Sequence, residues 1–167
     1  LASGKEITAE KILIAAGARP VMPAIDGIEH AISSNEVFHL DKLPKRIVIA
    51  GGGYIANEFA GIFHQFGSHV TMVNRTDVML RHYDQQIVDR LIQISLRKSI
   101  DFKFNATIDA VEKDEQGRLR IRMTGCDDLE ADQLLFALGR HPNTEQLGLD
   151  AVGVQLGEDP RQLRPER

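Results

Sequence analysis

The stretch that decides the fold is RIVIAGGGYIANEFAGIFHQFGSHVTMVNR, which spans residues 46–75. Its apolar opening at 46–50 predicts a buried strand, and 54–66 has the apolar spacing of a helix that Gly67 ends. A second apolar run, at 69–73, predicts another strand. The apolar stripe of the helix comprises Ile55, Phe59, Ile62, Phe63 and Phe66. A strand, a helix and a strand of these lengths predict a right-handed parallel crossover, the βαβ unit.

The turn inside this unit, GGGYIA at 51–56, fits the pattern G-x-G-x-x-G/A of dinucleotide-binding folds. Gly51 permits the sharp turn from strand to helix, and Gly53, which has no β-carbon, lets a pyrophosphate approach the backbone. Ala56 allows the helix to pack closely on the strand, and the free N–H groups of the helix N-terminus would face the phosphates. Glycine turns are common, so the flanking strands and helix are what favour dinucleotide binding over a purely structural turn.

The residues after the second strand indicate which dinucleotide is bound. An NAD-binding unit normally has an acidic residue here, which hydrogen-bonds the adenosine ribose. This sequence has Asn74 and Arg75, with Arg81 following in the same loop. Two guanidinium groups that converge on one phosphate form charge-assisted, fork-shaped hydrogen bonds, so the pair favours NADPH with its 2′-phosphate. The alternative is that both are ordinary surface arginines and that Asp77 neutralises one of them.

Hydrophobic periodicity predicts further elements on either side of this unit. They are a buried strand at 11–17, a helical turn capped by Ser34, a helix from Asp84 to about Lys98, an antiparallel hairpin within 101–123 and an apolar strand at 134–138. The apolar positions of the long helix are Ile87, Leu91, Ile94 and Leu96. The predicted fold class is α/β, a Rossmann-like parallel sheet with a βαβ dinucleotide-binding unit and an antiparallel β-meander or hairpin.

Composition limits the kinds of partner. The chain has 167 residues and a net charge of −4, so a nucleic-acid partner is not expected. Its apolar runs are shorter than the about 18 residues of a membrane span, so no membrane is expected either. The single cysteine, Cys126, excludes an internal disulfide or CxxC site, and a cytoplasmic location follows as the expectation. The six histidines show no ligand spacing, so no metal is expected.

Three stretches of the chain are more specific than a generic fold. They read GGGYIANEFAGIF at 51–63, NRTDVMLRHYD at 74–84 and LFALGRHPNTEQLGLDAVGV at 135–154. Together they closely resemble the pyridine-nucleotide domain of the flavoprotein disulfide reductases, above all that of the glutathione reductase branch. The resemblance covers about residues 8–157. Dihydrolipoamide dehydrogenases are similar in architecture, but an acid would be expected near Asn74 in that branch, which disfavours it.

The resemblance implies roles for residues at the start of the helix. Tyr54 would cover the nicotinamide pocket, Ile55 would offer backbone contacts, and Glu58 would position the carboxamide and a lysine near the flavin. Tyr54 could instead pack against the core, and Glu58 could be a plain exposed helix residue near the positive end of the dipole.

The resemblance also implies roles at the other ends of the nucleotide. Arg75 and Arg81 would hold the 2′-phosphate, while Leu138 and Gly139 would line the nicotinamide ribose. Arg140 would contact the cofactor as well, although it could also be a surface charge at the end of a strand.

The remainder of such an enzyme would lie outside this chain. The family uses FAD, a C-x-x-x-x-C pair and a catalytic histidine, none of which the sequence offers, so no catalytic residue is expected here and the isolated chain is expected to be inactive. Residues 1–40 would be the trailing part of a FAD-domain segment, 41–157 the NADPH-binding domain and 158–167 a disordered or non-family tail. Because the strand at 11–17 would lose its neighbours from the FAD domain and leave an apolar edge, we also expect residues 1–40 to be less ordered or buried in a dimer. Cys126 is expected to be inert.

The full-length enzyme is therefore expected to be a homodimer that passes electrons from NADPH through FAD and a dithiol to glutathione disulfide. Two alternatives stay open. One is a stand-alone NADP-binding or regulatory module that never uses flavin. The other is a related flavoprotein NAD(P)H oxidoreductase, such as an NADH oxidase or a ferredoxin reductase.

Overall fold

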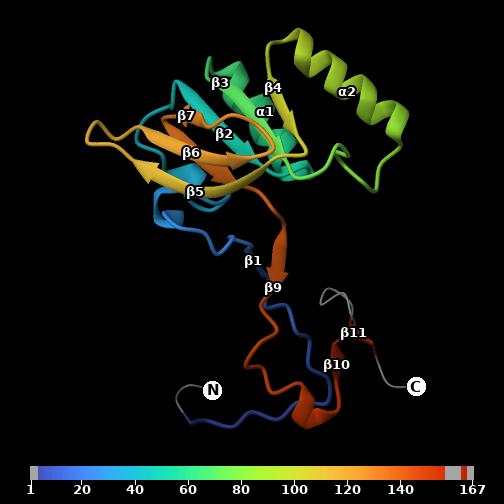
Figure 1. Cartoon of the computed structure of the whole chain (residues 1–167). Helices are drawn as coiled ribbons and strands as arrows, with labels where there is room; N and C mark the ends of the chain where they lie inside the picture. Colours follow the sequence, from blue (N-terminus) through green and yellow to red (C-terminus); the bar gives the residue numbers. More distant parts are fainter. Residues whose placement is uncertain (1–3, 157–162, 165–167) are drawn as a thin grey trace. The chain divides into compact units, whose positions relative to one another are not determined.

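The computed structural model describes residues 4–156 and 163–164. The chain divides into two compact units, one formed by Pro20–Arg140 and the other by Leu1–Arg19 with His141–Arg167. Strands β1 (Ala18–Pro20) and β9 (Arg140–Pro142) form a two-stranded sheet, and the boundary between the units falls within these strands (Figure 1).

The unit Pro20–Arg140 is built on a four-stranded parallel sheet of order β4-β3-β2-β8. Its strands are β2 (Arg46–Ala50), β3 (His69–Asn74), β4 (Asp101–Phe104) and β8 (Gln133–Phe136). Helix α1 (Tyr54–Gln65) connects β2 to β3, which pair in parallel with Ile47 opposite Val70. The predicted strand–helix–strand unit and the α/β fold class are therefore confirmed.

Side chains of β2 alternate between two cores on opposite faces of this sheet. Ile47 and Ile49 belong to one core together with Ala56, Ala60 and Phe63 of α1. Val48 and Ala50 belong to the other, together with residues of a three-stranded antiparallel sheet. The strands of that sheet are β5 (Thr107–Lys113), β6 (Leu119–Thr124) and β7 (Leu129–Ala131). The parallel sheet thus lies between α1 and this meander (Figure 1).

Helix α1 buries a narrower face than its apolar stripe predicts. Ala56, Ala60 and Phe63 are buried, whereas Ile62 is 45% exposed and Phe66 is 70% exposed. Small alanines let the helix approach the sheet closely, so the bulky residues to the side of that contact stay in solvent. The predicted end of the helix is confirmed, because Gly67 follows it with φ 93°.

Helix α2 (Gln85–Arg97) begins and ends where predicted, but it turns a different face to the core. The Asp84 carboxylate accepts hydrogen bonds from the backbone N–H groups of Gln86 and Ile87, and so caps the helix. Val88 is buried and Ile92 packs on the core beside it. The residues predicted to form the apolar face are all exposed: Ile87, Leu91, Ile94 and Leu96.

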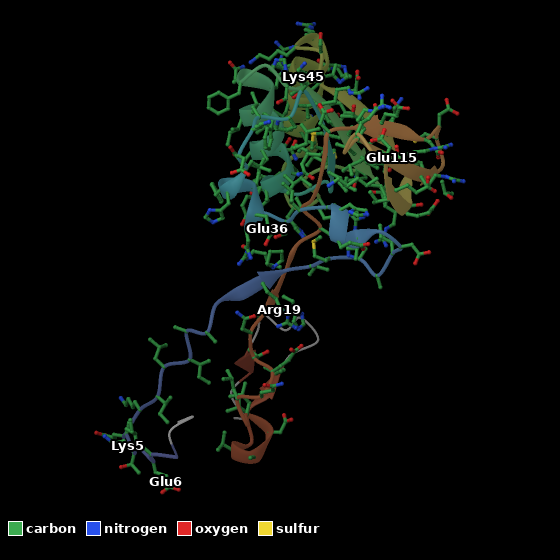
Figure 2. The ribbon with its side chains drawn as sticks, turned by 90° about the vertical axis from the view of Figure 1, so that its left-hand side faces the viewer. Lys5, Glu6, Arg19, Glu36, Lys45 and Glu115 are labelled. Atoms are coloured by element: carbon green, nitrogen blue, oxygen red, sulfur yellow. The ribbon has the colours of Figure 1, made fainter. Side chains whose placement is uncertain are left out.

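Three other predicted elements differ in the structure. Residues 11–17 are an exposed irregular segment rather than a buried strand, because no strand within residues 4–156 or 163–164 pairs with it. The first part of the predicted hairpin, Asp101–Phe104, is instead the edge strand β4 of the parallel sheet. The turn around Gly117 does join β5 to β6 as a hairpin, and Figure 2 labels Glu115, which lies in this turn.

The predicted cap at Ser34 is wrong, because Asn35 is the N-cap and the side-chain hydrogen bonds of the preceding turn involve Ser33. The Ser33 hydroxyl accepts from the backbone N–H of Asn35, and the Ser33 backbone N–H donates to the Glu36 carboxylate over 2.9 Å. The 3-10 helix Glu36–His39 follows this reciprocal pair, and Figure 2 labels Glu36. Another 3-10 helix, Ile28–His30, precedes it in the chain.

In the unit formed by Leu1–Arg19 and His141–Arg167, the two segments are joined mainly through polar contacts. The Asn143 backbone N–H donates to the Gly17 carbonyl, and Arg19 bonds both carboxylate oxygens of Glu145 at 2.8 Å. A 3-10 helix, Asp150–Val152, precedes β10 (Gln155–Leu156), which pairs with β11 (Leu163–Arg164). Apart from β11, the predicted tail at 158–167 lies outside the described residues.

Candidate nucleotide site at the carboxyl end of the parallel sheet

The loops that follow β2, β3 and β8 meet at one edge of the parallel sheet. Ala50, the last residue of β2, pairs with Val73 of β3 and with Phe136 of β8. The glycine turn therefore lies between the loop that begins at Arg75 and the loop that begins at Ala137. Ligands of open α/β sheets bind outside the carboxyl ends of the strands, so this edge is the candidate site.

At two of the three turn glycines, an added β-carbon would crowd other atoms of the protein. Gly51 has φ 137°, and a β-carbon there would lie 2.4 Å from the Ala137 carbonyl oxygen. A β-carbon on Gly52 would lie 2.9 Å from the carboxamide of Asn74. Because Gly51 and Gly52 have no side chain, the turn can lie close to the segments that end the two strands next to β2.

Gly53 is different from the other two. Its φ of −86° is open to any residue, and a β-carbon there would meet no atom within 4 Å. Neither backbone conformation nor packing therefore requires glycine at this position. The open space in front of its Cα is what the close approach of a pyrophosphate would use, so the residues present fit a bound dinucleotide.

The N-terminus of α1 opens toward the same space. No side chain caps the helix at Gly53, and its first turn contains no acidic residue. The first N–H groups of the helix are therefore left for a ligand, with the positive end of the helix dipole behind them. The Asn57 carboxamide donates to the Gly53 carbonyl over 2.8 Å and so fixes the peptide that follows Gly53. Ala56 is fully buried against the core, as its predicted packing role requires.

Tyr54 and Glu58 lie one helical turn apart on the exposed side of α1. The Tyr54 side chain is 60% exposed, and Glu58 is exposed as well. Neither side chain has a hydrogen-bond or ion-pair partner in the part of the chain that the structure describes. Ile55, between them, is half-buried and packs on the α1 core.

On the β3 side, the loop at 75–81 folds back onto the glycine turn. The Leu80 backbone N–H donates to the Gly52 carbonyl over 2.7 Å, and Met79 is buried. Arg75 and Arg81 are both exposed, and the Arg81 guanidinium lies 3.3 Å from the Thr76 hydroxyl oxygen. Asp77 pairs with neither arginine, and no carboxylate among the described residues does so.

On the β8 side, Leu138 is 46% exposed and Gly139 has φ 121° with open space at its Cα. The Gly139 carbonyl accepts a hydrogen bond from the backbone N–H of Val21. The Arg140 guanidinium lies 3.5 Å from the Ser34 hydroxyl. The three residues predicted for the nicotinamide side therefore follow the strand next to the glycine turn.

Some residues of this edge have no counterpart among the sequence predictions. They are Gly52, Thr76 and the carboxamide of Asn74, which all contribute to the loop at 75–81. Asn74 followed two residues later by Thr76 is a sequence pattern typical of side-chain-to-backbone turns. This pattern is the sequence signal from which the contacts of the loop could have been predicted.

Other chemistry is not assembled in the described residues. Residues 4–156 and 163–164 contain no group of three or more His, Cys, Asp or Glu side chains placed to hold a metal ion. All six histidines are exposed or half-buried, and Cys126 is a half-buried free thiol. Within that same part of the chain, no helix is both long and apolar enough to cross a bilayer.

The fold and this edge together define an α/β domain of the dinucleotide-binding class. Residues 1–162 match the family described as "Pyridine nucleotide-disulphide oxidoreductase", and the chain belongs to that family. Its relatives are flavoprotein disulfide reductases, which confirms the resemblance seen in the sequence.

Among these relatives, the glutathione reductase of Burkholderia cepacia is 42% identical over 157 residues, which cover 94% of this chain and 35% of that protein. A mercuric reductase of Lysinibacillus sphaericus is 36% identical, over 94% of this chain and 30% of the relative. The solved HOCl-induced flavoprotein disulfide reductase RclA of Escherichia coli has a TM-score of 0.81 and 33% identity, over 92% of this chain and 35% of that one. The chain thus spans about a third of the length of the relatives it matches.

Proposed function

We propose that the unit Pro20–Arg140 binds NADPH, as the pyridine-nucleotide domain of a flavoprotein disulfide reductase most like glutathione reductase. One observation carries this proposal: Arg75 and Arg81 flank Thr76 in a loop bonded to the glycine turn, with no carboxylate of the described residues paired to either. Unpaired guanidinium groups beside a phosphate-binding turn favour a ligand with a second phosphate group.

On the basis of the strand order, we assign the parts of the nucleotide to different loops. The pyrophosphate would lie against Gly53 and the N-terminus of α1, where the free N–H groups are. The adenosine half would extend toward β3, with its 2′-phosphate between Arg75 and Arg81. The nicotinamide half would extend toward β8. The residues that would contact that half are Tyr54, Ile55, Glu58, Leu138, Gly139 and Arg140.

The task of these residues in the whole enzyme is to position the nicotinamide. When bound, NADPH supplies a hydride, which in a flavoprotein reductase is taken by FAD. Arg75 and Arg81 would provide binding energy far from the reacting carbon, while Tyr54 and Glu58 would orient the ring. FAD and glutathione disulfide are proposed for the full-length protein because relatives at 42% and 41% identity are named glutathione reductase. The homodimer and the cytoplasmic location stay predictions.

Substitution of the two arginines tests the proposal. Arg75→Ala and Arg81→Ala are each expected to weaken NADPH binding by about 1–3 kcal/mol, the range for hydrogen bonds to a charged group. NADH binding is expected to change little, since NADH has no 2′-phosphate. Both affinities are measured by calorimetric titration at low salt, with far-UV circular dichroism to check folding.

A matched control is Arg97→Ala. Arg97 is an exposed arginine at the end of α2, which leads into the amino end of β4, at the opposite edge of the sheet. This variant is expected to bind both nucleotides like the wild type. Equal weakening of NADPH and NADH by the Arg75 and Arg81 substitutions would contradict the assignment of the 2′-phosphate.

A further inference from the structure

Asn74 ends β3 at the position where an NAD-binding unit normally has an acid, and the Nδ2 atom of its carboxamide is hydrogen-bonded within the protein. The Nδ2 atom lies 2.9 Å from the Thr76 carbonyl oxygen and 3.0 Å from the Val78 carbonyl oxygen. It lies 3.3 Å from the Thr76 hydroxyl oxygen as well, and that hydroxyl is also 3.3 Å from the Arg81 guanidinium. The carboxamide is therefore linked through Thr76 to one of the two arginines.

The same carboxamide also packs against the glycine turn. Its atoms lie 2.9–3.0 Å from the position that a β-carbon on Gly52 would take. The Leu80 backbone N–H reaches the Gly52 carbonyl from the other end of the loop. Leu80 has φ 48°, so the loop adopts a left-handed bend there that a leucine favours only when neighbouring contacts impose it. Leu80 thus bonds one end of the loop at 75–81 to Gly52, while Asn74 at the other end packs against the same glycine.

The chemistry at position 74 calls for a donor. Two carbonyl oxygens face the same side-chain atom, and carbonyls only accept hydrogen bonds, so that atom has to be the NH2 group of the amide. An aspartate of the same size has no proton to donate at neutral pH and would place a negative charge against both carbonyls. An aliphatic side chain would leave both carbonyls without this partner.

We infer that Asn74 is a positioning residue for nucleotide selection: it holds the loop at 75–81 against the glycine turn so that Arg75 and Arg81 face one phosphate group. Asn74 has no need to touch the nucleotide. Asn74 stands in place of an acid that would repel a 2′-phosphate, and its amide stabilises the turn that carries Arg75 and Arg81. This role rests on the proposed binding of NADPH.

The loop can be tested without any nucleotide, because trypsin cleaves after arginine and the loop is bounded by Arg75 and Arg81. Asn74→Leu keeps the approximate size of the side chain and removes both the donors and the polarity, and Asn74→Asp keeps the shape but only accepts. Both variants are expected to be cleaved after Arg75 or Arg81 about tenfold faster than the wild type, since local opening governs cleavage when reclosing is fast. Cleavage sites are identified by mass spectrometry.

The same variants are then titrated with NADPH and NADH. Asn74→Leu is expected to bind NADPH about tenfold more weakly, which corresponds to one charged hydrogen bond lost, with NADH affinity within about twofold of the wild type. The matched control is Asn143→Leu, which removes an exposed amide that donates to the Ala16 carbonyl in the other unit. That control is expected to leave both the cleavage after Arg75 and Arg81 and the NADPH affinity unchanged.

The outcomes separate this inference from the proposed function. If the wild type prefers NADPH and the arginine variants lose that preference while Asn74→Leu keeps it, the proposed function stands and the positioning role is wrong. Weakening of NADPH by Asn74→Asp alone would likewise overturn it, because charge repulsion would then explain the effect. A wild type without NADPH preference overturns both. If Asn74→Leu does not fold, Asn74→Ser, which keeps one donor, replaces it. Its cleavage rate and its NADPH affinity are expected to lie between the wild-type values and the tenfold changes given above. Wild-type values in both assays would contradict the inference.

Discussion

The backbone N–H of Leu80 donates to the carbonyl of Gly52 over 2.7 Å, and this bond ties the loop after β3 to the glycine turn after β2. Two features that a sequence shows as separate motifs, the turn and the arginine pair, are therefore parts of one surface. Movement of the loop would displace Arg81 relative to the place where the pyrophosphate is proposed to bind. The following predictions examine this surface and the fold that supports it.

Gly53→Ala is expected to fold as stably as the wild type, within about 0.5 kcal/mol, and to bind both nucleotides more weakly. The backbone at Gly53 has φ −86°, and the added methyl group would meet no protein atom within 4 Å. It would instead occupy the space proposed for the pyrophosphate, which NADPH and NADH share. Thermal unfolding measures the stability, and calorimetric titration measures the binding of both nucleotides. Unaltered binding would contradict the proposal that the pyrophosphate binds at this turn.

Gly51→Ala serves as the contrasting variant within the same turn. Its φ of 137° and the Ala137 carbonyl oxygen 2.4 Å from an added β-carbon both oppose any side chain. We expect a loss of stability of at least about 1–3 kcal/mol, the range for a residue held in such a backbone conformation. Denaturant unfolding should therefore show that Gly51→Ala is less stable than Gly53→Ala. Equal stabilities would contradict the backbone conformation and the close contact described for Gly51.

Ile49→Ala is expected to destabilise the unit by about 2–5 kcal/mol, the range for truncating a fully buried isoleucine. Ile49 is 0% exposed in the centre of β2, between the parallel sheet and α1. Ile87→Ala on α2 is the matched control, because Ile87 is 70% exposed and its truncation should change stability by less than about 0.5 kcal/mol. A large effect of Ile87→Ala would mean that α2 turns the other face to the core.

Salt is expected to weaken NADPH binding more steeply than NADH binding. The arginine pair is exposed, so its attraction to a 2′-phosphate is screened as the Debye length falls from about 10 Å at 0.1 M to about 3 Å at 1 M salt. Titrations of both nucleotides over this range provide the comparison, with NADH accounting for the salt dependence of the shared pyrophosphate. Parallel salt dependences would indicate that the second phosphate has no cationic partner.

The turn before the 3-10 helix Glu36–His39 should respond to acid. Hydrogen bonds from the Ser33 side chain and backbone lower the pKa of the Glu36 carboxyl below its ordinary value of 4.5. Because the folded state has the lower pKa, the stabilisation is present above the ordinary value and disappears as the pH falls through the lowered one. Ser33→Ala is expected to raise the pKa of Glu36 in an NMR titration and to reduce the acid dependence of unfolding, and an unshifted titration would contradict this.

Much of the central unit was predictable because its signals are local. The strand Arg46–Ala50, the helix Tyr54–Gln65 and the strand His69–Asn74 follow from apolar periodicity together with glycines at the two turns. Helix α2 has equally clear ends, because Asp84 caps it through its own side chain. Its buried face was less predictable, since Val88 and Ile92 form a second apolar stripe beside the longer one at Ile87, Leu91 and Ile94.

The errors occur where structure depends on neighbours distant in the sequence. Residues 11–17 have the composition of a strand, but a strand needs a neighbouring strand to pair with, and no strand of the described residues pairs with this segment. Asp101–Phe104 alternates like a hairpin strand, yet its pairing with β3 places it in the parallel sheet. At the candidate site, the motif identified the glycines and arginines. The contacts of Asn74 with Gly52, Thr76 and Val78 required the folded loop.

The most direct measurement is a calorimetric titration of the wild-type chain with NADPH and, separately, with NADH at low salt. Binding of NADPH at least about tenfold more tightly than NADH, equivalent to about 1.4 kcal/mol, is the predicted result. It would mean that the unit Pro20–Arg140 presents a nucleotide site that reads the 2′-phosphate. Equal affinities would contradict the selection of NADPH by Arg75 and Arg81, and a folded chain that binds neither nucleotide would contradict the nucleotide site itself.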